Sequence, residues 1–132
     1  MIFPYRRYLE RTFKEGYGIR KQDARTAFRA VATNSIGNPL AWSYLKANWK
    51  HISTYLGSFS SLGKLVSYVA GEFNTVEQKE ELEQFFRENE DALGSATMAF
   101  KQTIEQVDFN VAWMDKHYDA IVSWLKVNNP SR

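Results

Sequence analysis

The last third of the sequence contains an apolar pattern that an α-helix satisfies and a strand does not. Large apolar side chains recur there at alternating steps of four and three residues. Such steps place side chains along one side of a helix, whereas a half-buried strand needs alternation at every second residue. The pattern predicts one helix of roughly 40 Å, given a rise of about 1.5 Å per residue. Its members are Phe100, Ile104, Val107, Val111, Met114, Tyr118, Ile121 and Leu125.

Similar spacing predicts helices along most of the chain. No strand-like alternation lasts long enough to count, and the breaks between periodic segments are short and rich in glycine, serine or asparagine. A length of 132 residues is that of about one domain, so residues 1–132 are expected to form a single helical domain. Short connections favour antiparallel neighbours, and successive helix pairs of this size are typical of a diverged helical solenoid. The sequence thus predicts an all-α fold of antiparallel helix pairs, as part of an armadillo- or HEAT-like α-solenoid. The expected helices before the last one cover about 4–14, 21–34, 38–56, 62–73 and 76–89.

Two tryptophans lie one heptad apart on the predicted helix 38–56. Asn38 is a good helix N-cap residue, and Pro39 suits the first helical position, where no backbone donor is needed. The stripe that follows could be core, a partner groove or a ligand cage. We favour core, because a cage would need the indole rings open to solvent. The side chains expected in the core of the whole chain are Trp42, Leu45, Trp49, Ile52, Ile104, Val107, Trp113, Ile121 and Trp124.

Charge is distributed unevenly along the chain. Residues 1–51 carry a net charge of +7 and residues 52–132 a net charge of −5. A basic half can bind nucleic acid or an anionic peptide end, but it can equally be the solvated side of several helices. Nucleic-acid binding is not expected, because the aromatic residues among the basic ones fall on one helical face and are predicted to be buried. No run approaches the roughly 18 apolar residues of a membrane span, and direct membrane contact is not expected either.

The residues offer no recognisable catalytic arrangement. The two histidines, His51 and His117, lie in no metal-binding spacing, and the chain has no cysteine. Glycines 16 and 18 are not followed by the Lys-Ser/Thr pair that a phosphate loop needs. We therefore expect no catalytic residue, no metal ligand and no cofactor in this chain.

Three stretches together resemble one family. "IRKQDARTAFRAVATNSIGNPLAWSYLKANW" and "EFNTVEQKEELEQFFREN" resemble consecutive segments of M1-family zinc aminopeptidases, and "TIEQVDFNVAWMDKHYDAIVSWL" resembles the closing segment. Their order and spacing agree over about residues 8–126. The closing segment is similar to the endoplasmic-reticulum and leucyl-cystinyl branch.

The resemblance implies that the chain is the distal part of the C-terminal helical domain of such an enzyme. In the family this domain is a bowl of paired helices that closes over a thermolysin-like catalytic domain. The zinc-binding H-E-x-x-H and the G-[AG]-M-E-N motif lie far upstream in the family, and neither is present here. The chain is therefore expected to be inactive alone, with zinc only in the catalytic domain. Relatives occupy the secretory lumen, cell surfaces and the cytosol, of which the first two are favoured. The family also bends the last helical stretch, so a break is expected near residues 110–114.

Two functions remain open. The first is a non-catalytic segment of an aminopeptidase that covers the peptide cavity, supports folding and assists open and closed transitions while N-terminal residues are removed from peptides. Its partners would be the upstream helical and catalytic domains and the peptide substrate. The alternative is a free-standing helical protein-interaction module without enzymatic activity. Candidates for contact with the peptide's C-terminal carboxylate, which pairs well with a guanidinium, are Arg20, Arg25, Arg29 and Lys64.

A cut through a solenoid would have a physical consequence. Each repeat buries its apolar face against the next, so missing upstream helices would leave an apolar patch on the first two helices. We expect self-association through that patch, around Phe3, Tyr5, Leu9, Phe28 and Val31.

Overall fold

The computed structural model describes residues 2–57 and 59–129, and the side chains of 4–57 and 61–129. Within these ranges the chain is all-α and contains no strand, which confirms the predicted fold class. Three short 3₁₀ turns, η1 (Lys21–Asp23), η2 (Glu90–Ala92) and η3 (Gly94–Ala96), lie in the connections. The helices are α1 (Ile2–Thr12), α2 (Ala24–Ala32), α3 (Gly37–Leu56), α4 (Phe59–Ala70), α5 (Val76–Asn89) and α6 (Thr97–Asn128).

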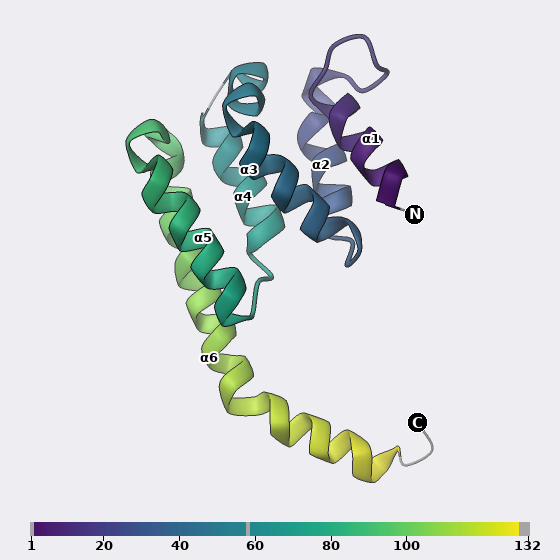
Figure 1. The fold of residues 1–132 in the computed structure, drawn as a ribbon, viewed down its shortest axis with the longest axis vertical. Coiled ribbons are helices and arrows are strands. Elements are labelled where there is room, and N and C mark those ends of the chain that lie inside the picture. Colours follow the sequence, from purple (N-terminus) through teal and green to yellow (C-terminus); the bar gives the residue numbers. More distant parts are fainter. Residues whose placement is uncertain (1, 58, 130–132) are drawn as a thin grey trace.

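The helices are arranged as hairpins side by side in two layers. Figure 1 shows α1, α3 and α5 in the nearer layer, with α2, α4 and the first part of α6 behind them. Each helix packs against its hairpin partner, and α2, α4 and α6 also pack against one another in sequence. This arrangement is compatible with part of an α-solenoid.

The start of α3 differs from the expectation. Asn38 is not the N-cap, because α3 begins one residue earlier, at Gly37, and the capping oxygen comes from Asn34. The Oδ1 atom of Asn34 accepts hydrogen bonds from the backbone N–H groups of Ile36 and Gly37, at 2.9 and 3.0 Å. α3 ends at Leu56, and the C-cap residue that follows, Gly57, has a left-handed φ of 72°, which favours glycine. The capping box that opens α5 is formed by Thr75 and Gln78.

The tryptophans of α3 lie between neighbouring hairpins. Trp42 meets the rings of Phe73 and Phe85 edge to face, with centroids 5.6 and 5.7 Å apart, and Trp49 meets Phe85 at 6.4 Å. Phe85 in turn stacks on Phe100 of α6 at 5.9 Å. Such offset and edge-to-face pairs add to the free energy gained by removing the rings from water. Of the side chains expected in the core, Trp42, Leu45, Trp49, Ile52 and Val107 are buried, and Ile104 is partly buried.

The expectation of a core position is wrong for Trp113, Ile121 and Trp124. These side chains are 44%, 43% and 63% exposed. The reason is that α6 continues beyond the end of the hairpin stack, where no other described helix lies beside it (Figure 1). α6 is one continuous helix, so the chain is not interrupted near residues 110–114 as expected. The helix does bend, however, because Figure 1 shows it changing direction sharply partway along its length.

Among the described side chains, the apolar patch expected on the first two helices is not present either. Leu9, Phe28 and Val31 are 1%, 0% and 3% exposed, and Tyr5 is partly buried against the core. α1 and α2 pack on each other and on α3, which covers the faces that an upstream repeat was expected to cover. The side chain of Phe3 lies outside the described residues. Among the described helices none is long and apolar enough to cross a membrane.

Candidate functional site

A basic strip lies on the layer formed by α2 and α4. Arg25 and Arg29 are one helical turn apart on α2, and Lys64 lies one turn before Tyr68 on α4. The guanidinium carbon of Arg29 lies 5.1 Å from the centroid of the Tyr68 ring, which is a cation–π distance. This contact joins the two helices and places Arg29 of α2 beside Tyr68 of α4.

The two helices run in parallel, as the bonds of Asn38 show. Its Nδ2 atom donates to the carbonyl oxygens of Ala32, at the end of α2, and of Val69, at the end of α4, each at 2.8 Å. Because both helices end at the same side chain, Arg25 and Lys64 lie toward the same end of the layer. The structure therefore places three of the four predicted basic candidates on one surface.

These three cations are not neutralised within the described part of the chain. No carboxylate oxygen of a described residue lies within 4.0 Å of a side-chain nitrogen of Arg25, Arg29 or Lys64. The fourth candidate, Arg20, differs: its Nε donates to Oδ2 of Asp23 at 2.8 Å. Arg20 also lines a separate hollow beside Tyr55. The sequence analysis thus grouped one cation that is paired with three that have no carboxylate partner among the described residues.

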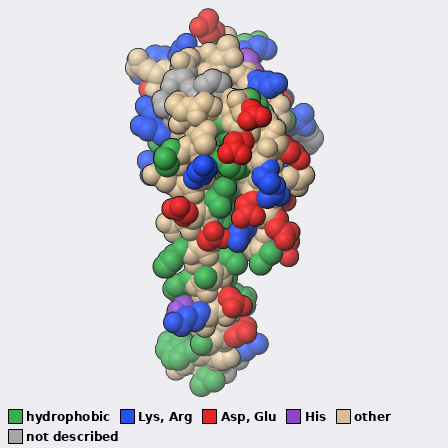
Figure 2. Space-filling view, turned by 90° about the vertical axis from the view of Figure 1, so that its left-hand side faces the viewer, with side chains coloured by type: hydrophobic (Ala, Val, Ile, Leu, Met, Phe, Trp, Pro, Cys, Tyr) green, Lys and Arg blue, Asp and Glu red, His purple; other side chains and the backbone are tan. Residues whose placement is uncertain are grey.

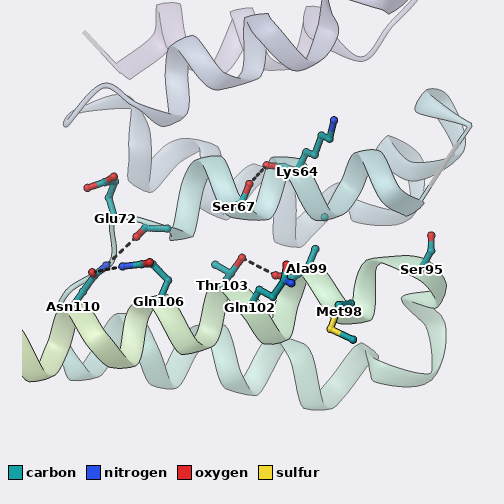
Figure 3. A pocket seen from close by; sticks show the side chains of 12 residues that line it. Lys64, Ser67, Glu72, Ser95, Met98, Ala99, Gln102, Thr103, Gln106 and Asn110 are labelled. Atoms are coloured by element: carbon teal, nitrogen blue, oxygen red, sulfur yellow. Dashed lines mark hydrogen bonds between the residues drawn. The ribbon is translucent and has the colours of Figure 1, made fainter.

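A polar groove runs beside the strip, between α4 and α6 (Figure 3). Its volume is about 900 Å³, and it is open to solvent along its length. Lys64 lies toward one end, and Glu72 and Asn110 lie at the other. Its floor is formed by small residues because α4 and α6 approach closely: a Cβ atom on Gly63 would lie 2.6 Å from the Cβ atom of Ala99.

Asn110 fixes the far end of this groove. Its Nδ2 donates to the carbonyl oxygens of Gly71 and Phe73, both at 2.9 Å, and its Oδ1 accepts from Nε2 of Gln106 at 2.9 Å. The bonds satisfy carbonyl groups just beyond the end of α4, which have no intrahelical partner. Asn38 has the same role for α2 and α4. The sequence analysis missed the roles of both asparagines. The one available signal was that Asn110 is a polar residue beside the apolar stripe of residues 100–125.

In the opposite layer, formed by α1, α3 and α5, the carboxylate of Glu81 links α5 to α3. Oε2 of Glu81 on α5 accepts from the indole N–H of Trp42 at 3.0 Å and from Nζ of Lys46 at 3.2 Å. The hydrogen bond from Trp42, with a further one from Lys46, holds the pKa of the Glu81 carboxyl below its usual range. On the other side of α5, the Lys79 ammonium pairs with Asp108 of α6, and this hydrogen bond raises the pKa of Lys79.

The described residues form no cluster of metal-binding type. No group of three or more His, Asp or Glu side chains within residues 2–57 and 59–129 is placed to hold a metal ion. His51 is exposed, with Nε2 3.0 Å from the carbonyl oxygen of Phe13. The ring of His117 lies 5.0 Å from that of Trp113. The geometry as a whole is that of a helical scaffold with a cationic strip and a polar groove.

Known proteins are similar to this chain in sequence. Residues 5–108 match the family described as the ERAP1-like C-terminal domain. The chain is 35% identical over 127 residues to aminopeptidase Ey of Gallus gallus. The aligned region covers 95% of the chain and 13% of that protein. It is 35% identical over 125 residues to aminopeptidase N of Oryctolagus cuniculus, and 33% identical over 125 residues to aminopeptidase N of Homo sapiens, each covering 93% of the chain and 13% of the relative.

The chain therefore belongs to the family of C-terminal helical domains of M1 aminopeptidases. It spans about one eighth of the length of these curated relatives. The similarity to the endoplasmic-reticulum and leucyl-cystinyl branch stays a prediction.

Proposed function

We propose that this chain serves as a non-catalytic segment of an M1-type aminopeptidase, in which the α2, α4 and α6 layer covers the peptide cavity. The observation that carries the proposal is the strip of Arg25, Arg29 and Lys64, which lacks carboxylate partners among the described residues. A peptide's C-terminal carboxylate would supply the missing charge, and the adjoining groove offers polar groups to its backbone. Zinc and the hydrolytic step would belong to the catalytic domain of the parent enzyme.

The proposed scaffolding role rests on the bonds between hairpins. Asn38 joins α2, α3 and α4, Glu81 joins α3 and α5, and Asn110 joins α6 to the chain beyond α4. We expect a segment linked in this way to move as a unit, as a lid that assists open and closed transitions would have to do. The same links would support folding of the longer chain.

The contribution of each cation to peptide binding is expected to be small. An exposed ion pair contributes about 0.2–1 kcal/mol, so three together would change the affinity by roughly tenfold. The measurement is a titration of the chain with a nonapeptide bearing a free C-terminal carboxylate and with its C-terminal amide, followed by amide chemical shifts. The free acid should bind more tightly, with shifts concentrated on α2 and α4.

Substitution tests which residues are responsible. The triple variant Arg25→Gln, Arg29→Gln, Lys64→Gln should remove the preference for the free acid, whereas Arg7→Gln on the exposed surface of α1 should leave it unchanged. Arg20→Gln should have less effect than Arg29→Gln, because Asp23 already engages Arg20. Equal binding of acid and amide by the unsubstituted chain would contradict the proposal.

The second candidate, a free-standing interaction module, is favoured by a different observation. α6 leaves a large apolar face uncovered beyond the hairpin stack. A reading frame in which catalytic domains precede the segment would favour the aminopeptidase role over the module.

A further inference from the structure

The polar groove between α4 and α6 carries one charge of each sign. Of the 12 described residues that line it, only Lys64 and Glu72 have charged side chains. Lys64 lies toward one end of the groove and Glu72 lies at the other (Figure 3). On the face that Figure 2 shows, by contrast, acidic and basic side chains are interspersed over the hairpin stack. The separation of charge along the groove is therefore a local feature of this site.

Glu72 is exposed and has no cationic partner among the described residues. No nitrogen of a described Lys, Arg or His side chain lies within 4.0 Å of its carboxylate oxygens. The carbonyl groups of Gly71 and Phe73, on either side of it, accept hydrogen bonds from Asn110 of α6 at 2.9 Å. The backbone around Glu72 is thus anchored to α6, while its carboxylate remains open to a cation from outside the chain.

The wall between the two charges suits a peptide backbone rather than one particular side chain. Gln102 and Gln106 lie one helical turn apart on α6 and line the groove. A glutamine amide both donates and accepts hydrogen bonds, as a peptide bond does. Nε2 of Gln106 donates to Oδ1 of Asn110, which holds this amide along the wall. Contacts of this kind depend little on peptide sequence, so the two charges are the part of the groove that can discriminate among peptides.

The spacing of Lys64 and Glu72 sets which residue of a peptide each one meets. Positions 64 and 72 are separated by roughly 12 Å along α4, at a rise of about 1.5 Å per residue. An extended peptide advances about 3.3 Å per residue, so it covers this separation in three to four residues. A peptide with its C-terminal carboxylate at Lys64 would therefore bring the side chain three or four residues earlier to Glu72.

In the proposed function, on which this inference rests, the peptide's C-terminal carboxylate lies at the strip of Arg25, Arg29 and Lys64. The N-terminus continues toward the catalytic domain, so Glu72 meets a side chain and not the terminal ammonium. We propose that Glu72 is a specificity-determining residue, which selects peptides with a lysine or arginine three or four residues before the C-terminal residue. A glutamate or aspartate at the same position is disfavoured, because like charges repel.

A lysine scan tests the spacing. The probes are nonapeptides of alanine and serine with a free C-terminal carboxylate and one lysine at a varied position. Their N-termini are acetylated, which removes the terminal ammonium as a competing cation. Titration of the 132-residue chain is followed by amide chemical shifts.

Lysine at peptide position 5 or 6 should bind about two- to fivefold more tightly than the peptide without lysine, as expected of an exposed ion pair. Lysine at position 8 should bind more weakly than that peptide, because it would lie beside Lys64. A scan without a maximum at position 5 or 6 would overturn the proposal.

Reversal of the charge tests the residue. Glu72→Lys should reverse the preference, so that glutamate at peptide position 5 or 6 binds more tightly than lysine. The matched control Glu105→Lys makes the same change on an exposed part of α6 that does not line the groove, and it should preserve the preference for lysine. Circular dichroism checks that both variants are folded. A preference for lysine that persists in Glu72→Lys would overturn the role of Glu72, and so would a reversal in both variants, because net charge would then explain it.

The C-terminal amides of the same peptides separate this inference from the proposed function. If the free acid binds more tightly than the amide but the lysine scan is flat, the proposed function stands and the role of Glu72 is overturned. If acid and amide bind equally, the proposed function is contradicted, and the spacing from a carboxylate at Lys64 is overturned with it.

Discussion

Asn38 provides the sharpest test of how the hairpins are held together. Its side chain is half-buried, and its Nδ2 atom donates two hydrogen bonds of 2.8 Å to carbonyl groups at the ends of α2 and α4. The substitution Asn38→Ala removes both donors and leaves two carbonyl groups without that partner. Ala32 and Val69, which carry these carbonyls, are 2% and 0% exposed, so water has poor access to replace the lost bonds.

The magnitude follows from these contacts. Each net hydrogen bond contributes about 0.5–1.5 kcal/mol, and an unsatisfied buried group costs about 1–3 kcal/mol. The higher helix propensity of alanine offsets this loss by roughly 0.6 kcal/mol. We therefore expect the free energy of unfolding to fall by about 2 kcal/mol, which for a chain of this size lowers the melting temperature by roughly 6–8 °C.

The assay is urea and thermal unfolding of the chain followed by circular dichroism. The matched control is Asn48→Ala, on the same helix, where the asparagine is also half-buried but donates only to the carbonyl of Tyr44 within α3. That variant should stay within about 0.5 kcal/mol of the original chain, as local side-chain bonds within a helix compete weakly with propensity. If Asn38→Ala were no more destabilising than Asn48→Ala, the proposed joint between α2, α3 and α4 would be refuted.

Two further predictions concern α5 and α4. The pKa of Glu81 lies below that of the unfolded chain, so its bonds to Trp42 and Lys46 stabilise the fold above about pH 4.5 and are lost as the pH falls through the folded value. Glu81→Gln should thus reduce the fall in the free energy of unfolding between about pH 5 and pH 3, whereas the control Glu80→Gln should not. Because Glu81 is half exposed, Glu81→Gln should lower the free energy of unfolding at pH 7 by less than about 1 kcal/mol. Gly63→Ala should lower the free energy of unfolding by about 1–3 kcal/mol, because the added methyl group would lie too close to Ala99. The double variant Gly63→Ala, Ala99→Gly should recover stability in urea unfolding, and a lack of recovery would contradict this packing.

The candidate site was only partly accessible to sequence reasoning. Charge alone proposed Arg20, Arg25, Arg29 and Lys64, but it could not tell that Asp23 engages Arg20. The grouping of the other three depends on α2 and α4 running side by side in parallel, a long-range relation set by Asn38. The groove beside them depends on the approach of Gly63 to Ala99, residues 36 positions apart in the sequence.

The sequence by itself determined the helices, because apolar periodicity, capping residues and glycine breaks act within a few neighbours along the chain. The capping box at Thr75 and the helical stripe of residues 100–125 are of this kind. Only the tertiary structure decided which stretches of each stripe are covered. The same 3.5-residue repeat is buried at Phe100 and Val107 and exposed at Ile121 and Leu125, because burial depends on whether another helix lies alongside, and local sequence carries no record of that.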